Sequence, residues 1–362
     1  MCQCEPQNGI FLDKNKIINH FKNLEYKTNF EVMKCFGLFS KEGLIKNIAH
    51  YIISSIILLH IILGIVFHFK EYNKFIIEIF DVAKDSKRII EKKKQKKNNI
   101  NRNNNLFTKN NNIEYMTNID DKSTKEKEII ETSEEIYYKD YEINNIPYEK
   151  ALEIDKRSYC QLYFSLIKNY HIVFFTFNCN KDHNPRIIKI CFFFFVFALY
   201  MFINTLFFND AFMHKIYLNK GQFSFILALP QIIYSVIICR IIIIILKNLS
   251  LTQNNVLEIL FENNISILNI KLIKVIECIK KKIIFFFVFS FIFLLFFWYY
   301  LSCFCFIYYN TQIYLFKVIL ISYSIALVYP FIFSLFPGLF RIPALKSSGK
   351  CIYIITKLFN YL

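Results

Sequence analysis

The stretch that decides the fold is "IIKICFFFFVFALYMFINTLFF", residues 187–208. Most of its side chains are apolar. It is also long enough to cross a bilayer, because about 20 residues at ~1.5 Å per residue cover the ~30 Å of hydrocarbon. Similar runs lie at residues 48–69, 223–246, 283–306 and 313–336. The sequence therefore predicts an all-α protein, a polytopic bundle of about five transmembrane helices.

The composition is typical of a membrane protein. Hydrophobic residues make up 55% of the 362, and 42 of them are Phe. The formal net charge of +16 would suggest a nucleic-acid ligand in a soluble chain. In a membrane protein, basic residues gather on the cytosolic side, and no nucleic-acid recognition module stands among the spans. We therefore expect the lipid bilayer, and no nucleic acid, as the partner of this chain.

The distribution of basic residues predicts the orientation. Lys residues are frequent between the third and fourth runs, and the C-terminal end carries Arg341, Lys346, Lys350 and Lys357 without an acidic residue. The turn at 307–312 has no charge. Because Lys and Arg accumulate on the cytosolic side, we expect the N-terminus to be outside or luminal and the C-terminus to be cytosolic. The glycosylation acceptors Asn248 and Asn264 then fall on the cytosolic side, so we expect neither to be modified.

The segments around the spans differ in composition. We expect an outer N-terminal tail at 1–47, a cytosolic helical extension with a short coiled-coil-like seam at 70–90, a disordered charged loop at 91–146, an interfacial helix region at 147–186, a cytosolic amphipathic helix at 249–281 and a cytosolic tail at 337–362. Disorder is expected because "EKKKQKKNNINRNNNLFTKNNN", residues 91–112, cannot bury a core. The interfacial region is expected to begin as a helix near Pro147, and "NCNKDHNPR", residues 178–186, is expected to be a turn.

Basic residues near the inner leaflet are candidates for contact with lipid headgroups. Lys92, Lys93, Lys94, Lys96 and Lys97 can attract anionic inner-leaflet lipids, at ~1 kcal/mol per charge close to the surface. A merely solvated run of charge is the alternative.

Arg240 is a further candidate, because it lies inside the third span. Its long side chain can extend to the inner headgroups, and we expect a lipid-headgroup contact there. The alternative is a charge that faces the bundle interior and marks a functional pathway. The five predicted spans contain no acidic residue that could pair with it there.

An apolar stripe runs along the predicted helix at 249–281. Its members recur every three or four residues and are Leu257, Phe261, Ile265, Leu268, Leu272, Val275 and Ile279. A stripe of this kind needs a partner helix. We expect packing within the chain, with a homo-oligomer, a membrane-protein partner or the membrane surface as alternatives.

The sequence carries no motif for catalysis, and we expect no cofactor and no metal. Cys2, Cys4 and Cys35 lie on the outer side, where Cys35 can form a disulfide with either of the others. No Cys-x-x-Cys pair occurs that would indicate a zinc site. In the outer loop at 207–221, Asp210, Met213 and His214 could ligate a metal, but a loop that joins two helices is the simpler interpretation.

The stretches "RIIKICFFFFVFALYMFINTLFFND", "LALPQIIYSVIICRIIIIIL" and "FFWYYLSCFCFIYYNTQIYLFKVILISYSIALVYPFIFSLFPGLFRIPAL" carry a resemblance. They resemble multispan protist membrane proteins of unknown function with Cys-rich ectodomains. More distantly, they resemble the first five spans of polycystin-type receptor subunits, in which basic residues also open the second span, as Arg186 and Lys189 do here. The loop at 70–186 departs from that pattern, because it shows no sign of a β-sandwich.

These observations favour a non-enzymatic multi-pass membrane protein, a receptor-like or accessory subunit that assembles with a membrane partner. The alternative is a channel or transporter subunit that moves ions or small solutes. In that case polar residues within the spans, such as Asn204, Ser290 and Ser322, would have to line the path.

Overall fold

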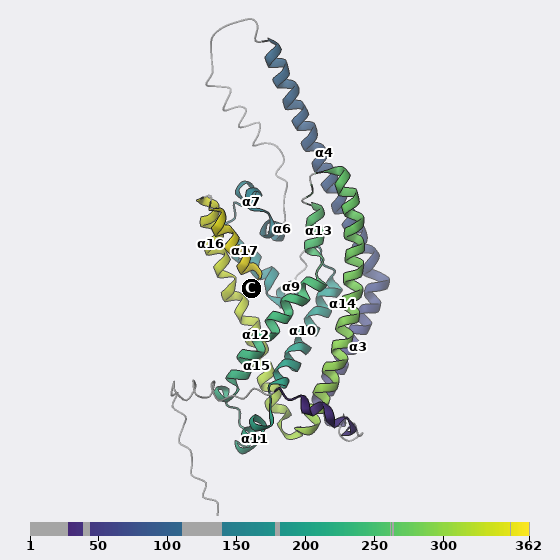
Figure 1. Cartoon of the computed structure of the whole chain (residues 1–362), viewed down its shortest axis with the longest axis vertical. Coiled ribbons are helices and arrows are strands. Elements are labelled where there is room, and N and C mark those ends of the chain that lie inside the picture. The colour runs from purple at the N-terminus through teal and green to yellow at the C-terminus, as the bar shows by residue number, and fades with distance from the viewer. Residues whose placement is uncertain are drawn as a thin grey trace, which may run out of the picture. The chain divides into compact units, whose positions relative to one another are not determined.

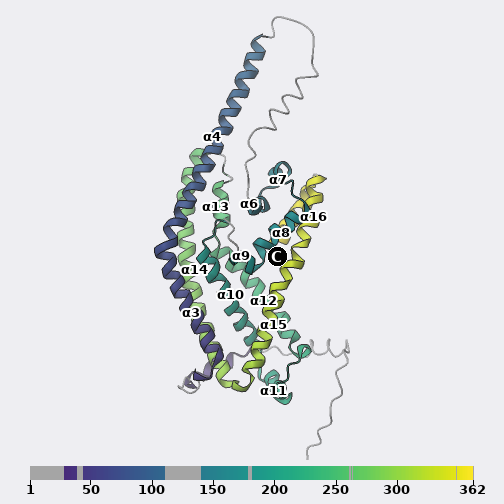
Figure 2. The same ribbon diagram turned by 180° about the vertical axis from the view of Figure 1, so that it is seen from behind.

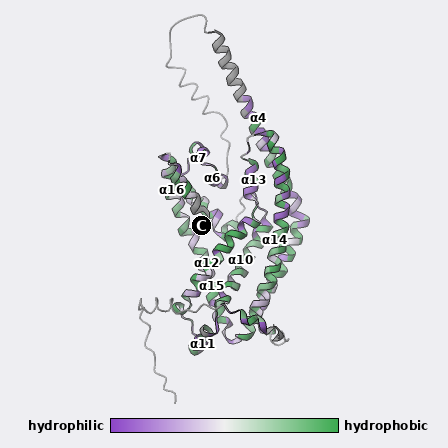
Figure 3. Ribbon diagram, in the orientation of Figure 1, coloured by the Kyte–Doolittle hydropathy of each residue, from purple (hydrophilic) through white to green (hydrophobic). Residues whose placement is uncertain are grey.

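The computed structural model describes residues 28–38, 44–110, 140–177, 182–260, 262, 264–347 and 349–361. Every regular element in these ranges is a helix, so the predicted all-α class is confirmed (Figure 1). Five of the helices in the described ranges are long and apolar enough to cross a membrane. Hydrophobic residues colour α10 (Arg186–Leu206) and α12 (Phe225–Ser250) along most of their length (Figure 3). The chain is an integral membrane protein.

The chain divides into two compact units. The first unit comprises Met1–Gly64, Ile190–Leu249 and Phe286–Pro330, and the second comprises Ile65–Lys189, Ser250–Phe285 and Phe331–Leu362. The first unit therefore holds most of the apolar sequence. The second holds most of the segments predicted to be cytosolic.

The first unit is built around α10. Its other elements are the 3-10 helix η1 (Phe30–Leu38), α3 (Ile48–Val66), α11 (Asp210–Leu218), α12, the second part of α14 (Ile265–Ile307), the short η3 (Tyr309–Thr311) and α15 (Gln312–Phe333). In the most apolar 18-residue stretch of α10, 78% of the residues are buried within the chain. In the corresponding stretches of the other four spans, 22–39% of the residues are buried. Aromatic rings fill the space beside α10, and Phe202 stacks on Phe297 of α14 with ring centroids 4.6 Å apart. Most residues in the apolar stretches of the other four spans are therefore not buried within the chain.

The second unit is a cluster of shorter helices with one long one. Its elements are the π-helical turn η2 (Phe67–Glu71), α4 (Tyr72–Asn110), α6 (Asp140–Asn145), α7 (Tyr148–Ile154), α8 (Tyr159–Tyr170), α9 (Ile172–Phe177), α13 (Gln253–Leu260), the first part of α14, α16 (Leu335–Lys346) and α17 (Lys350–Tyr361). Within it α16 packs on α17 and on α8, α6 packs on α8, and α13 packs on α4. Figure 2 shows α6, α7, α8 and α16 gathered together. The residues predicted as a C-terminal tail thus form the helices α16 and α17, and α16 packs on α8.

Residues 91–110 are helical, which corrects the prediction of disorder for this part of the charged loop. Helix α4 contains neither Pro nor Gly, and its Lys, Arg, Gln and Glu residues have good helix propensity. A composition that cannot bury a core excludes tertiary packing, but it does not exclude a solvated helix. Residues 111–139 of the predicted loop lie outside the described residues.

The predicted cytosolic helix at 249–281 is not one helix. Helix α12 ends at Ser250, α13 covers Gln253–Leu260, and α14 begins at Ile265 and continues through the fourth span. The side chain of Asn264 accepts a hydrogen bond from the backbone N–H of Ser266 at 3.1 Å, which is the geometry of a helix N-cap. This cap starts a new helix within the apolar stripe.

The stripe itself lies in the interior of the second unit. Leu257, Leu268, Val275 and Ile279 are buried, Ile265 and Leu272 are half-buried, and Phe261 lies outside the described residues. Helix α13 packs on α4, and the first part of α14 runs beside α4 in both views. At least part of the stripe is therefore covered by the chain's own helices.

The sequence predicted that one helix starts near Pro147, but the structure has two shorter helices there. Helix α7 starts directly after Pro147 and ends at Ile154, and α8 starts at Tyr159. Ser158 caps α8 in a capping box with Gln161. The residues between the two helices carry the polar network described below.

Candidate functional site

The second unit contains a buried polar junction, which we define as Glu71, Glu78, Glu142, Asp182, His183, Asn184, Lys189 and Thr252. At its centre are Asp182, His183 and Asn184, which are 4%, 5% and 9% exposed. These residues fall in the stretch that the sequence predicted to be a simple turn. Side chains from α4, α6 and η2, the first turn of α10 and the start of α13 meet there, so the segment is a packing centre.

A buried ion pair holds the first turn of α10. The ammonium of Lys189 lies 3.2 and 3.3 Å from the two carboxylate oxygens of Asp182, and the two side chains are 3% and 5% exposed. The Lys189 ammonium also lies 5.2 Å from the ring centroid of Phe175 in α9. Two charges so far from water depend on each other, because either one alone would bear its full desolvation cost.

Glu71 caps the start of α10. Its carboxylate accepts a hydrogen bond from the backbone N–H of Ile187 at 3.2 Å. A carboxylate at this position stabilises the positive end of the helix dipole. Glu71 belongs to the π-helical turn that joins α3 to α4, so the continuation of the first span helps to hold the beginning of the second.

Asn184 caps the start of α13. Its side-chain oxygen accepts hydrogen bonds from the backbone N–H groups of Thr252 at 3.0 Å and Gln253 at 3.2 Å. The Thr252 hydroxyl in turn donates to the backbone oxygen of His183 at 2.7 Å. The loop after the third span is therefore fixed to the loop before the second.

His183 lies between two carboxylates. Its Nδ1 is 3.7 Å from Oε1 of Glu78 in α4, and its Nε2 is 3.4 Å from Oε1 of Glu142 in α6. The side chain of Glu142 is buried, and that of Glu78 is half-exposed. The backbone of His183 has φ of 56°, in the left-handed region that few residues other than glycine adopt. The surrounding contacts must therefore outweigh this conformational cost.

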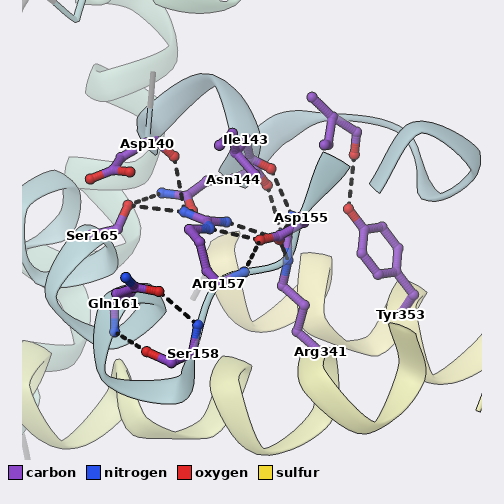
Figure 4. A network of polar contacts seen from close by, with 11 residues as sticks. Asp140, Ile143, Asn144, Asp155, Arg157, Ser158, Gln161, Ser165, Arg341 and Tyr353 are labelled. Carbon is purple, nitrogen blue, oxygen red and sulfur yellow. Dashed lines mark hydrogen bonds and ion pairs between the residues drawn. The ribbon is translucent and has the colours of Figure 1, made fainter. Parts of the chain in front are cut away.

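A second polar network, which we call the clasp, is centred on Asp155 between α7 and α8 (Figure 4). Arg341 of α16 donates to Asp155 at 2.8 Å, and Arg157 donates to it at 2.7 and 3.0 Å. Burial alone would raise the pKa of the Asp155 carboxyl. The hydrogen bond from Arg157 and the positive charge of Arg341 outweigh that effect and lower the pKa below its usual value.

Arg341 also holds the end of α6. Its guanidinium donates to the backbone oxygens of Ile143 at 2.7 Å and Asn144 at 3.1 Å, and the residue is only 1% exposed. Asn144 accepts from Arg157 at 2.9 Å through its side-chain oxygen and donates to the Ser165 hydroxyl at 3.0 Å. The clasp therefore joins α6, α8 and the helix that follows the last span.

Tyr353 of α17 completes this arrangement. Its hydroxyl donates to the backbone oxygen of Ile146 at 2.9 Å, and its ring lies 5.1 Å from the Arg341 guanidinium (Figure 4). Together with Ile146, Ala151 and Ala344, Tyr353 also forms a small buried apolar core. Helix α6 takes part in both networks, because Glu142 belongs to the junction and Asn144 belongs to the clasp.

The predicted headgroup contact at Arg240 stays a prediction. The Arg240 guanidinium is half-buried and lies 5.0 Å from the ring centroid of Tyr329 in α15, which is a cation–π arrangement. Among the predicted polybasic residues, Lys92 and Lys94 are exposed on α4. The side chains of Lys93, Lys96 and Lys97 lie outside the part of the structure that is described.

The predicted disulfide also stays a prediction. Cys2 and Cys4 lie outside the described residues. Cys35 belongs to η1, but its side chain is not among those described. In the part of the chain that the structure describes, no group of three or more His, Cys, Asp or Glu side chains could hold a metal ion.

The polar residues that a transport path would need do not form one group. The Asn204 amide of α10 donates to the Ser322 hydroxyl of α15 at 3.2 Å. Ser290 of α14 instead lies 2.9 Å from Nε2 of His60 in α3. Each pair joins two helices of the first unit, so these polar groups take part in helix packing.

The residues of the junction and the clasp are those that sequence reasoning missed. Their contacts are remote in the chain, as for Asp155 with Arg341 and Glu71 with Ile187. A local signal existed only in the Asp-His-Asn-Pro sequence at 182–185 and in an arginine at the start of the tail. The chain matches no known protein-family model, and comparisons with curated proteins and with solved structures find no match either.

Proposed function

We propose that the chain is a non-enzymatic integral membrane protein, a receptor-like or accessory subunit that assembles with a membrane partner. The observation that carries this proposal is that the buried polar groups of the chain make contacts between its own segments. In the second unit they hold helices to one another through the Asp155–Arg341 and Asp182–Lys189 ion pairs. In the first unit they pair across helices. These contacts favour a structural and regulatory role over catalysis or transport.

The orientation forms part of this proposal. The second unit contains Lys280, Lys281 and Lys282 and the basic helices α16 and α17, and basic residues favour the cytosolic side. On this basis the N-terminus is outside or luminal, and the second unit is cytosolic. Lys92 and Lys94 of α4 then lie where anionic inner-leaflet lipids can bind them.

The composition of the native complex tests the proposed function. The full chain, tagged at the C-terminus, is expressed in its own cells, solubilised gently and purified with whatever remains bound. An accessory subunit is expected to bring down another multispan protein at constant stoichiometry through two different detergents. A homogeneous assembly of this chain alone would contradict the accessory role.

A flux assay separates the proposal from the alternative of a channel or transporter. The purified chain is reconstituted alone in liposomes, and ion and solute flux is compared with that of the Arg240→Gln variant. We expect no flux above that of empty liposomes. Flux that Arg240→Gln changes would establish a transport pathway through the bundle and overturn the proposal.

A further inference from the structure

Exposed apolar side chains gather where α8, α9 and α16 meet the end of the last span. We call them the boundary patch, and they are 36–60% exposed: Phe164 of α8, Phe174 of α9, Phe331 and Ile332 of α15, and Leu335 of α16. An exposed apolar patch marks a site of interaction with a protein or with a membrane. The surroundings of this patch decide between the two.

The elements that carry the patch are in contact with one another. The ring of Phe174 lies 6.3 Å from the ring of Phe331, measured between centroids. Tyr163, which precedes Phe164 in α8, donates its hydroxyl hydrogen to the backbone oxygen of Phe331 at 3.2 Å. Helices α8 and α9 also pack on each other. Side chains from three helices therefore lie around the last turn of the span.

A close contact fixes α8 against α16. The Tyr159 hydroxyl donates to the backbone oxygen of Leu335 at 3.0 Å. A Cβ atom on Gly338 would lie 2.6 Å from Cε2 of Tyr159, so a side chain there would force the two helices apart. Figure 2 shows α8 beside α16. The position of α8 is thus tied to the helix that follows the span.

The length of the last span places the patch at a membrane boundary. Helix α15 has 22 residues, which cover about 33 Å at the helical rise, and the hydrocarbon layer is ~30 Å thick. Phe331 and Ile332 belong to its last turn. They and the side chains beside them therefore lie where the hydrocarbon meets the headgroups.

The exposed side of the span also continues into the patch. Val328, Ile332 and Leu335 are all exposed and follow one another by four and three residues, so they share one side of α15 and the start of α16. An exposed side of a membrane span contacts acyl chains. A surface that continues it without interruption at the same boundary favours lipid over a protein partner.

Helix α8 has the pattern of a helix at a membrane surface. Leu162 and Leu166 are buried on one side. Cys160, Phe164 and Lys168 are exposed and spaced by four residues, so they form a line on the other side. An aromatic ring on such a line can enter the apolar layer, while the long side chain of Lys168 extends to the headgroups.

We propose that the boundary patch contacts the acyl chains of the leaflet in which α15 ends, so that α8 and the first turn of α16 are partly embedded in it. Lipid thus covers a surface outside the five spans. Because Asp155 and Arg157 lie directly before α8, this contact also holds the clasp at the membrane. The inference holds in either orientation of the chain, and it does not depend on an accessory role.

Tryptophan fluorescence tests the contact, because the chain has only 1 Trp. In a Trp298→Phe background, Phe164→Trp and Leu335→Trp each place one indole in the patch. The full chain is reconstituted in phosphatidylcholine vesicles with or without bromine on the acyl chains, and acrylamide serves as the quencher in water. Should Trp298→Phe fail to fold, the same comparison is made with Trp298 kept and the signal of the parent chain subtracted.

Two control positions set the scale. Val328→Trp reports on the exposed side of the span, and Glu153→Trp reports on an exposed position of α7. We expect brominated lipid to quench both patch probes as strongly as Val328→Trp and to leave Glu153→Trp bright, with the opposite order for acrylamide. A patch probe quenched by acrylamide and not by brominated lipid would show a surface in water. A patch probe quenched by neither would show a surface covered by protein, for example by a second copy of the chain. Either result would overturn the proposal.

Discussion

Arg341 and Asp155 form a buried ion pair across 186 residues of sequence, with the guanidinium 2.8 Å from the carboxylate. The pair joins the helix that follows the last span to the loop between α7 and α8. Arg341 uses its remaining donors on the carbonyls of α6, which satisfies its fork-shaped guanidinium. The contact thus fixes three segments at once and explains why a charge is stable at 1% exposure.

Removal of Arg341 should loosen the second unit. Arg341→Met leaves the Asp155 carboxylate with only Arg157 and leaves the α6 carbonyls without their donor. We expect a loss of about 3–5 kcal/mol in the free energy of unfolding, the usual result when one partner of a buried pair is removed. Thermal unfolding in detergent and limited proteolysis between α6 and α8 measure it.

The exposed pair of Lys350 and Glu149 supplies the control for this variant. These side chains are 63% and 66% exposed, so Lys350→Gln should change unfolding little. Arg341→Lys keeps the charge but not the fork, and it should fall between the wild type and Arg341→Met. If Arg341→Met unfolds no earlier than Lys350→Gln, the clasp does not stabilise the second unit.

Acid should weaken the clasp. In the folded protein the pKa of the Asp155 carboxyl lies below its ordinary value of 3.8. A carboxyl with a depressed folded pKa contributes stability that is fully present above the unfolded value and is lost as pH falls through the folded one. We therefore expect the melting temperature to fall below about pH 4, and Asp155→Asn should lower it at neutral pH and flatten this part of the pH profile. An unchanged acid slope in Asp155→Asn would assign the acid sensitivity to other carboxyls.

The five spans could be predicted because the bilayer fixes the length of an apolar run, and each run stands alone in the sequence. The junction and the clasp could not, because their charges belong to segments that look solvated when read locally. Asp182 and His183 read as turn residues, and Arg341 reads as a basic residue on the cytosolic side. Only the packing of remote helices removes them from water and makes their pairing necessary.

The break at Asn264 shows a different limit. The apolar stripe keeps its spacing from Leu257 through Ile279, so periodicity alone indicates one helix. The side chain of Asn264 restarts the helix by capping Ser266, and a single Asn inside a polar stretch is a weak signal. Helix α4 shows the reverse case, because its composition suggests disorder while its lack of Pro and Gly permits a long helix.

Lys189→Met should destabilise the start of α10. The variant leaves the Asp182 carboxylate buried without its cation, and we expect a loss of about 3–5 kcal/mol in the free energy of unfolding. The double variant Lys189→Met with Asp182→Asn removes both charges and should recover part of that loss. Unfolding in detergent measures all three chains. A double variant less stable than Lys189→Met alone would mean that Asp182 is held by groups other than Lys189.

Glycosylation mapping tests the orientation. With the C-terminus in the cytosol, neither Asn248 nor Asn264 meets the glycosyltransferase, although each lies in an acceptor sequence. We expect the chain made with microsomes to show no glycan at either site. As a control, Gly221→Ser turns Asn219-Lys-Gly into an acceptor in the loop between the second and third spans, where the proposed topology exposes it to the lumen; Ser is used because Gly221 has φ of 71°, which a β-branched Thr would strain more. A shift in mass removed by a glycosidase is expected for that variant alone. A glycan on Asn248 or Asn264 would reverse the orientation and place the second unit outside the cytosol, and the inner-leaflet contacts proposed for Lys92 and Lys94 would fall with it.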